Sequence, residues 1–110
     1  MPNDIKFFHS EDLVNQQLLE GSLVNFTHSS SMTLAEWNFE PNTLLPEHSH
    51  PHEQITKIIS GEFELIIENK KYSLKAGSVA IIPPHAVHSA KSITACHIMD
   101  VFHPVREDFR

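Results

Sequence analysis

The segment that decides the fold reads Pro46-Glu-His-Ser-His-Pro-His-Glu-Gln54, and it is followed further along the chain by His88, which comes after a Pro-Pro turn. His48 and His50 are two residues apart, so in an extended segment their side chains leave the same face and can converge on one point. Neutral imidazole is the most common side-chain ligand for divalent transition metals. A single histidine here would be interpreted as a solvated turn residue, but the grouping predicts a metal site.

The rest of the chain has the pattern of short β-strands. In Glu62–Glu68 apolar residues alternate with acidic ones, which is typical of a half-buried strand, and Leu34–Glu40 alternates in the same way. Several short strands with tight turns predict an all-β fold, either a sandwich or a small barrel. Four further strand candidates are separated by turns rich in Gly, Pro and Asn: Gln54–Ser60, Lys71–Leu74, Val79–Ile82 and Ile93–Phe102.

The amino-terminal segment has a weaker pattern. Side chains in Glu11–Leu19 have helical spacing, but the segment is short and Gly21 could close either a helix or a hairpin. Both alternatives stay open at this point. We expect residues 1–110 to form a single domain, in which residues 1–20 are an amino-terminal strand or extension.

Composition and charge limit the classes of function. A chain of 110 residues has room for one modest core, and 40% hydrophobic with 20% charged residues is ordinary for a soluble globular protein. No apolar run approaches the roughly 20 residues of a spanning helix, and the start lacks the layout of a signal peptide. Cys96 is the only cysteine and cannot form an internal disulfide. We therefore expect a cytoplasmic protein that is not bound to a membrane.

The balance of charges favours a small-molecule partner. The formal net charge is −6, whereas binding to nucleic acid or to an anionic membrane requires a basic surface. The nine histidines outnumber the eight lysines and arginines together. We expect no nucleic-acid partner.

Both histidine segments resemble the two motifs of the cupin superfamily. Asn42-x5-His48-x-His50-x3-Gln54-x6-Gly61 has every interval of the first motif, and Gly77-x5-Pro83-x-His85-x2-His88 has every interval of the second. The resemblance implies a conical double-stranded β-helix of the jelly-roll type. It also implies that one divalent metal ion is held by four residues: His48, His50, Gln54 and His88. Nickel, zinc, iron and manganese all suit such a ligand set.

The sequence departs from the cupin motifs at three positions. Asn42 and His85 stand where the motifs have glycine, and Asn is tolerable there if the turn needs a positive φ. Gln54 stands where most members have glutamate. An amide adds no negative charge, so a bound ion would keep its full charge to polarise a substrate oxygen. The alternative interpretation is a site that has lost its metal.

The carboxyl end resembles a narrower group, the KdgF family of pectin-degradation proteins. The run Asp100-Val-Phe-His-Pro-Val-Arg106-Glu-Asp-Phe109 is similar to the family's tail, and His48–Gln54 matches its first motif, H-x-H-P-H-E-Q. The resemblance implies isomerase-type opening of 4,5-unsaturated uronate monosaccharides, which pectin and alginate lyases release. It also implies that the functional residues are Asp100, Phe102 and Arg106.

These three residues permit both functional and structural roles. Asp100 and Phe102 share strand parity, so both face a cavity if either does. A carboxylate beside a bound sugar can transfer protons. The guanidinium group of Arg106 can donate two parallel hydrogen bonds to a uronate carboxylate. Trp37 and Phe102 could form apolar walls against the sugar ring. Without the resemblance, we would interpret Asp100 as a hydrogen-bond acceptor, Phe102 as core, and Arg106 as a surface cation paired with Asp108.

Two other functions compete with uronate ring opening. A dioxygenase of the quercetinase type would need a redox metal and a larger apolar pocket. A non-catalytic cupin that binds a sugar or effector would use the same metal site without turnover.

The outer surface predicts a homodimer. Met99 and Val101, with Ile93 and Ala95, would form a large apolar patch on a monomer. We expect two copies to associate through this face and through the amino-terminal segment Ile5–Phe8.

Overall fold

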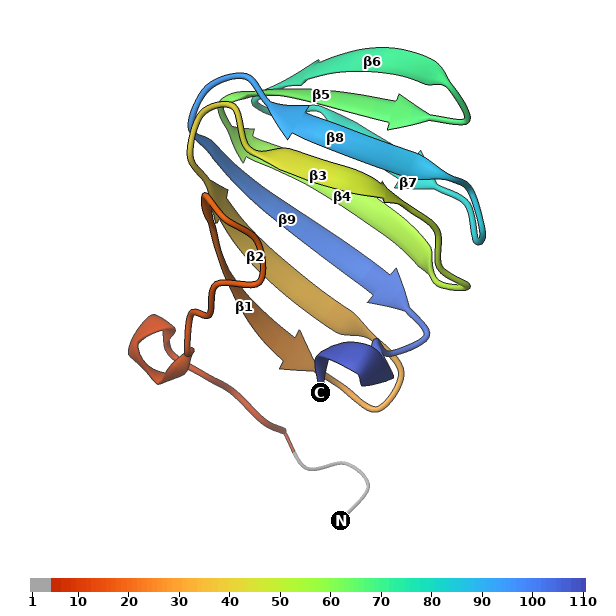
Figure 1. Ribbon diagram of the computed structural model, residues 1–110. Coiled ribbons are helices and arrows are strands. Elements are labelled where there is room, and N and C mark those ends of the chain that lie inside the picture. The colour runs from red at the N-terminus through yellow and green to blue at the C-terminus, as the bar shows by residue number, and fades with distance from the viewer. Residues whose placement is uncertain (1–4) are drawn as a thin grey trace.

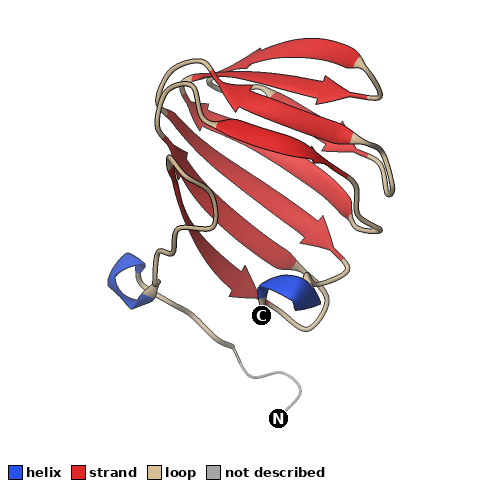
Figure 2. Cartoon of the chain, viewed as in Figure 1, coloured by secondary structure: helices blue, strands red, loops and turns tan. Residues whose placement is uncertain are grey.

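The computed structural model describes residues 5–110, which form two antiparallel sheets that face each other (Figure 1). Within these residues nearly all of the regular structure is strand, with two short 3-10 helices, η1 (Ser10–Asp12) and η2 (Glu107–Phe109) (Figure 2). The five-stranded sheet has the order β1 (Ser22–His28), β2 (Thr33–Phe39), β9 (Cys96–His103), β4 (Glu53–Ser60) and β7 (Val79–Ile82). The four-stranded sheet has the order β3 (Leu44–His48), β8 (His88–Ser92), β5 (Glu62–Ile67) and β6 (Lys70–Lys75). This arrangement confirms the predicted all-β jelly-roll barrel.

Alternation along the strands builds the core between the sheets. In β2 every second residue is buried and the residues between are more exposed, because successive side chains of a strand point to opposite faces. The same alternation runs along β5 at Phe63 and Leu65, and along β9 from Cys96 to Phe102. The larger apolar side chains that meet in the core are Trp37, Phe39, Ile58, Phe63, Leu65, Ile82, Ile98 and Phe102.

One predicted strand, Ile93–Phe102, is wrong at its beginning. A turn separates β8, which ends at Ser92, from β9, which begins at Cys96. The turn packs against Gly61, where a Cβ atom would come within 2.2 Å of the backbone oxygen of Ala95. Ile93 and Ala95 therefore belong to the connection and not to the outer row of β9.

The amino-terminal segment is neither the helix nor the strand left open above. Only Ser10–Asp12 forms a 3-10 turn, and Gln16 makes an isolated bridge to Val24 of β1. Most of residues 5–18 therefore lie outside regular structure. Residues 1–4 of the predicted extension lie outside the described residues.

Both motif positions that have lost a glycine retain the backbone conformation of one. Asn42 has φ of 63° and His85 has φ of 67°, in the left-handed region that costs most residues roughly 1–2 kcal/mol. Asn and His are among the side chains that visit this region most readily. The two turns therefore keep the geometry of the motif, as expected for Asn42.

An apolar stripe crosses the outer face of the five-stranded sheet. Leu34, Val101, Ile55 and Ile81 are paired in register across β2, β9, β4 and β7, and each side chain is at least 36% exposed. The amino-terminal arm is also uncovered, with Ile5 90% exposed and Phe7 75% exposed. Because a strongly apolar surface of this kind favours association, the homodimer predicted above remains our proposal.

We therefore expect the protein to sediment as a dimer at micromolar concentration. Ile55→Asp should yield a monomer, since it would bury an unpaired charge in the contact. Tyr72→Asp is the matched control, because Tyr72 is similarly exposed but lies on the other sheet, and this variant should remain dimeric. A wild-type protein that sediments as a monomer would contradict the proposal.

Candidate metal centre

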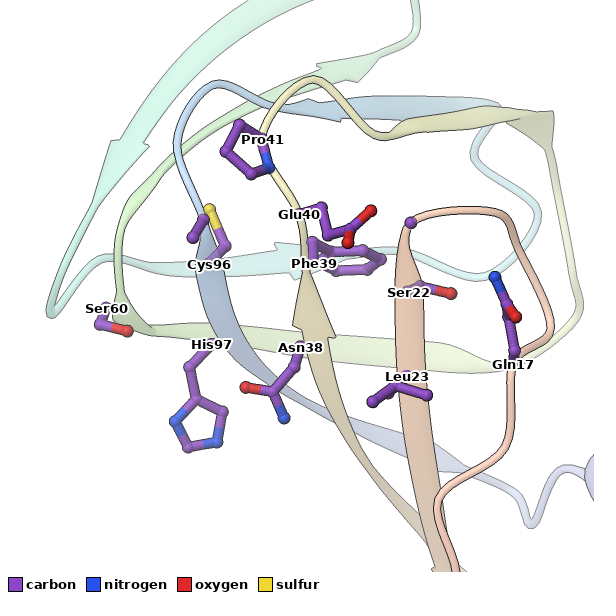
Figure 3. Close-up of a pocket in the computed structure, with 12 residues that line it drawn as sticks. Gln17, Ser22, Leu23, Asn38, Phe39, Glu40, Pro41, Ser60, Cys96 and His97 are labelled. Carbon is purple, nitrogen blue, oxygen red and sulfur yellow. The ribbon is translucent and has the colours of Figure 1, made fainter.

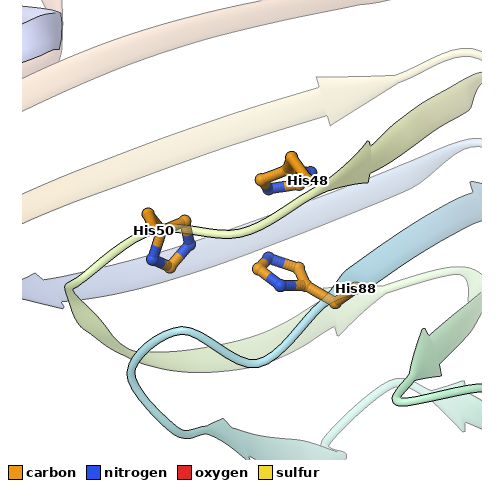
Figure 4. Close-up of side chains that lie close together, drawn as sticks. All are labelled: His48, His50 and His88. Carbon is orange, nitrogen blue, oxygen red and sulfur yellow. The ribbon is translucent and has the colours of Figure 1, made fainter.

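Three histidines meet at one end of the barrel. His48 ends β3 and is paired in register with His88, which begins β8, while His50 lies in the loop that leads to β4. The ring centroids of His48 and His88 are 4.1 Å apart, and those of His50 and His88 are 5.0 Å apart. One nitrogen from each of the three rings lies within 4.8 Å of the others (Figure 4). The prediction that these three residues converge is confirmed.

Main-chain carbonyls fix the orientation of all three rings. The Nδ1 atoms of His48, His50 and His88 lie 2.8, 3.1 and 2.9 Å from the backbone oxygens of Pro46, His52 and Ala86. A carbonyl oxygen can only accept, so these bonds favour the proton on Nδ1 and a lone pair on Nε2 in His48 and His88, and His50 can adopt the same tautomer. A hydrogen bond of this kind at the remote nitrogen is the usual support of a metal-binding histidine.

The nitrogens that face one another fit a cation. Among residues 5–110, the Nε2 of His88 is buried without a hydrogen-bond partner. Burial, with the charge of Arg106, lowers the pKa of His50 to about 4, and burial also lowers the pKa of His88. Both rings are therefore neutral near pH 7. Convergent neutral imidazoles are a ligand set for a divalent transition metal, so the residues present fit such an ion.

Gln54 lies beside this cluster on β4. Its side-chain oxygen is 3.0 Å from the Nε2 of His50, and its amide nitrogen donates to the hydroxyl of Thr56 over 2.9 Å. The Thr56 hydroxyl donates in turn to a carboxylate oxygen of Asp100 over 2.6 Å. All three side chains are buried. Our sequence reasoning did not identify Thr56, although its parity with Gln54 places both on the inner face of β4.

Asp100 lies in an apolar environment that disfavours its charge. Burial raises the pKa of its carboxyl group to about 6, against the opposing effect of hydrogen bonds from Thr56, Gln54 and Trp37. The predicted parity is confirmed, because Asp100 and Phe102 both point inward. Perturbed carboxyl groups of this kind are common where protons are transferred.

A cavity of about 250 Å³ connects these groups. It is comparable in size to one sugar ring. The polar groups at its wall include His48, His88, Gln54 and Asp100, and its apolar wall includes Trp37. Further lining side chains come from the tail and the amino-terminal segment: Phe102, Arg106, Phe109, Leu18 and Leu19.

Arg106 is held at the cavity by contacts on two sides. Its guanidinium carbon lies 4.7 Å from the ring centre of Phe102 and 4.1 Å from that of Phe109. Its Nε and one terminal nitrogen donate to the two carboxylate oxygens of Asp108, over 3.0 and 2.7 Å. This ion pair lowers the pKa of Asp108. The sequence allowed Arg106 to be either a cation paired with Asp108 or a residue of the cavity. In the structure it is paired with Asp108 and also lines the cavity.

The remaining histidines do not belong to the cluster. The ring of His52 lies 5.5 Å from that of His50, with its Nδ1 buried and without a partner among residues 5–110. His97 lies on the outer face, where its Nε2 is 2.7 Å from Glu36. The backbone N–H of His85 donates to the backbone oxygen of His50 over 2.7 Å, so the second motif supports the loop of the first.

A larger hollow of about 580 Å³ lies at the opposite end of β9 from Phe102 (Figure 3). It is lined by residues such as Asn38, Glu40 and Cys96, and it contains none of the cluster histidines. The Cys96 thiol is buried and donates to the backbone oxygen of Glu62. We therefore take the smaller cavity as the candidate site. Within residues 5–110, no helix is long and apolar enough to cross a membrane.

Comparisons with known proteins agree with this geometry. A family model described as a cupin domain matches residues 35–102. The pectin degradation protein KdgF of Dickeya dadantii (strain 3937) is 29% identical over 85 residues, which cover 76% of this chain and 77% of that protein.

Two solved structures have nearly the same fold. KdgF from Halomonas sp. has a TM-score of 0.91 with 24% identity, and the match covers 97% of this chain and 100% of that one. An RmlC-like cupin from Shewanella frigidimarina NCIMB 400 has a TM-score of 0.90 with 25% identity, and covers both chains completely. The family match spans more than half of the chain and includes the histidine loop and β9, so this protein belongs to the cupin family.

Proposed function

We propose that this protein is a metal-dependent enzyme that opens the ring of 4,5-unsaturated uronate monosaccharides. The observation that carries the proposal is the composition of the 250 Å³ cavity, where a buried carboxyl group, an arginine and a histidine cluster surround space for a single sugar ring. The similarity to two KdgF proteins, one of which is named a pectin degradation protein, supports this substrate class.

We propose that His48, His50, His88 and Gln54 hold one divalent ion. A bound ion would polarise a substrate oxygen as a Lewis acid. The four donors are neutral, so they would leave the positive charge of the ion available to an acidic sugar.

Arg106 would bind the carboxylate of the uronate. Asp108 occupies Nε and one terminal nitrogen of its guanidinium group, so the other terminal nitrogen remains for a substrate oxygen. The stacked rings of Phe102 and Phe109 hold the guanidinium plane in place. Trp37 and Phe102 would contact the apolar face of the sugar ring.

Asp100 would transfer the proton. In the ring opening, the anomeric hydroxyl loses a proton, the bond between C1 and the ring oxygen breaks, and C4 of the enol ether gains a proton. The product is an isomer with an aldehyde at C1 and a ketone at C5, so no further reactant is needed. A carboxyl group whose pKa is raised toward neutrality can both accept and return this proton.

The two competing functions use the same site differently. A dioxygenase acting on a multi-ring flavonoid would need more space than this cavity offers. A binding protein would hold the sugar without changing it, and the activity experiment below distinguishes this case.

The metal content of purified protein tests the ligand set. Elemental analysis should find about one divalent ion per chain, and His48→Ala or His88→Ala should remove most of it, because each change removes one of few donors. His97→Ala is the control, since His97 lies on the outer face, and it should retain the metal. Full occupancy in the doubly substituted His48→Ala, His88→Ala protein would exclude the proposed site.

Ultraviolet absorbance tests the reaction. The conjugated enol ether and carboxylate of an unsaturated uronate absorb near-ultraviolet light, and ring opening destroys this conjugation. Metal-loaded protein should therefore accelerate the loss of absorbance well above the spontaneous rate. Asp100→Asn should lower kcat by roughly 100-fold or more with little change in KM, since it keeps the shape but removes the proton-transfer group. If neither the galacturonate nor the alginate-derived substrate reacts, the enzyme proposal fails and the binding function replaces it.

Arg106→Ala should act in a different way from Asp100→Asn. The contact with the substrate carboxylate exists in the ground state and in the transition state alike, so its loss should raise KM with a smaller effect on kcat. Initial rates over a range of substrate concentrations separate the two constants. Arg110→Ala is a matched control, because Arg110 pairs with Glu107 at the surface and does not line the cavity. A change confined to kcat in Arg106→Ala would contradict the assigned role.

A further inference from the structure

We infer that Thr56 is a positioning residue whose hydroxyl group carries a one-way hydrogen-bond chain from Gln54 to Asp100 and so holds the Gln54 oxygen toward the histidines. The inference rests on the proposed function, because it assigns a task to Gln54 as a metal ligand. It adds a residue that the first cupin motif spans but does not specify.

The direction of the chain follows from its two ends. Asp100 accepts the Thr56 hydroxyl proton over 2.6 Å, a short distance that is typical of a hydroxyl donating to a carboxylate. A hydroxyl group has a single proton, so Thr56 can only accept from its other neighbour. That neighbour is the side chain of Gln54 at 2.9 Å, which must therefore present its NH2 group to Thr56.

The orientation of the Gln54 amide is thereby determined. With its NH2 group directed to Thr56, its oxygen lies 3.0 Å from the Nε2 of His50. His50 has an acceptor at each ring nitrogen, the backbone oxygen of His52 at Nδ1 and the Gln54 oxygen at Nε2. To hold a metal ion through Nε2, the ring must keep its proton on Nδ1, and the Gln54 oxygen then faces a lone pair, an arrangement that a cation near both atoms would stabilise. Without Thr56, only the hydrogen bond from Gln54 to Asp100 would oppose a turn of the amide that brings its NH2 group to His50.

The same chain accounts for an amide at position 54. A glutamate there would be a second acceptor beside Thr56, and a single hydroxyl proton cannot serve two carboxylates. Either the glutamate or Asp100 would lose the hydrogen bond from Thr56, and Asp100 would also lose the one that Gln54 donates, which makes burial of the charge less favourable. Gln54 and Thr56 are therefore a matched pair, and Asp100 determines the direction in which they bond.

Metal affinity tests the role of Thr56 without depending on catalysis. The metal-free full-length protein is titrated with Zn²⁺ against a competing chelator, and its fold is checked by circular dichroism and thermal melting. Thr56→Val has the same shape but no hydroxyl group. This variant should bind Zn²⁺ roughly 10-fold or more weakly, which is the usual effect of removing a residue that forms a hydrogen bond to a metal ligand. Thr56→Ser restores the hydroxyl group and should return the affinity to within a few-fold of wild type.

The Asp100→Asn variant distinguishes the effect of the hydrogen-bond chain on metal affinity from the effect of the negative charge of Asp100. Asparagine keeps an oxygen that can accept from Thr56, so this variant should bind Zn²⁺ like wild type while its turnover falls. A folded Thr56→Val protein with wild-type affinity would overturn the inference, as would a Thr56→Ser protein as weak as Thr56→Val. If Asp100→Asn lost as much affinity as Thr56→Val, the charge of Asp100 and not the chain would be responsible, and this too would overturn it.

The outcomes for Thr56 and for the enzyme are separable. If the variants follow the predicted affinities but wild-type protein leaves both uronates unchanged, Thr56 keeps its role and the proposed reaction is wrong. If wild-type protein binds no Zn²⁺, nickel or manganese, both the metal site and the role of Thr56 are excluded.

Discussion

The candidate site depends on three imidazole rings that are held close together at one end of the barrel, where the Nε2 of His88 is buried without a partner among residues 5–110. A polar atom that is buried without a partner lowers the stability of a fold, typically by 1–3 kcal/mol. The chain nevertheless holds His48, His50 and His88 in this arrangement by bonding each Nδ1 to a backbone carbonyl. The His88 ring cannot turn this atom away without giving up its bond to the backbone oxygen of Ala86. The arrangement therefore fits a positive ion, and an ion that bound there would also stabilise the folded state.

Strand register places residues of the candidate site at paired positions in both sheets. His48 and His88 come from paired positions of β3 and β8, whereas Thr56 and Asp100 come from paired positions of β4 and β9. The first pair belongs to the four-stranded sheet and the second to the five-stranded sheet. Gln54 of β4 connects the histidine cluster to the second pair, because its oxygen faces His50 and its nitrogen faces Thr56. A slip of one residue in either sheet would turn one pair outward and leave the other without its counterpart.

Much of this structure was predictable because spacing and alternation are local properties of a sequence. The intervals between His48, His50 and His88 predicted their convergence, and parity placed Asp100 on the inner face beside Phe102. Three strands escaped prediction: β1, β3 and β8. β1 contains apolar residues but no alternation, because the adjacent residues Val24 and Asn25 are both buried. In β3 nearly all residues are exposed, and β8 buries small and polar side chains such as Ser92.

Other features depended on contacts between distant segments. The break between β8 and β9 follows from the close approach of the turn to Gly61, which no local pattern encodes. Threonine is common in strands, so the sequence does not single out Thr56. Its proposed role depends on Asp100, which lies opposite it on β9 and accepts its hydroxyl proton. The position of Arg106 was ambiguous for a related reason, since both the surface pair and the cavity wall are real contacts of the same side chain.

The short helix η2 holds the carboxyl end of the chain beside the cavity. It begins directly after Arg106, and Phe109, which stacks on that guanidinium group, also stacks on Phe26 of β1 at 4.5 Å. Any polypeptide joined after Arg110 therefore leaves from beside the cavity. A purification tag or reporter protein fused at this end would crowd Arg106 and Phe109, which line the cavity, whereas a fusion at the amino end would be separated from it by residues 5–8, none of which lines the cavity.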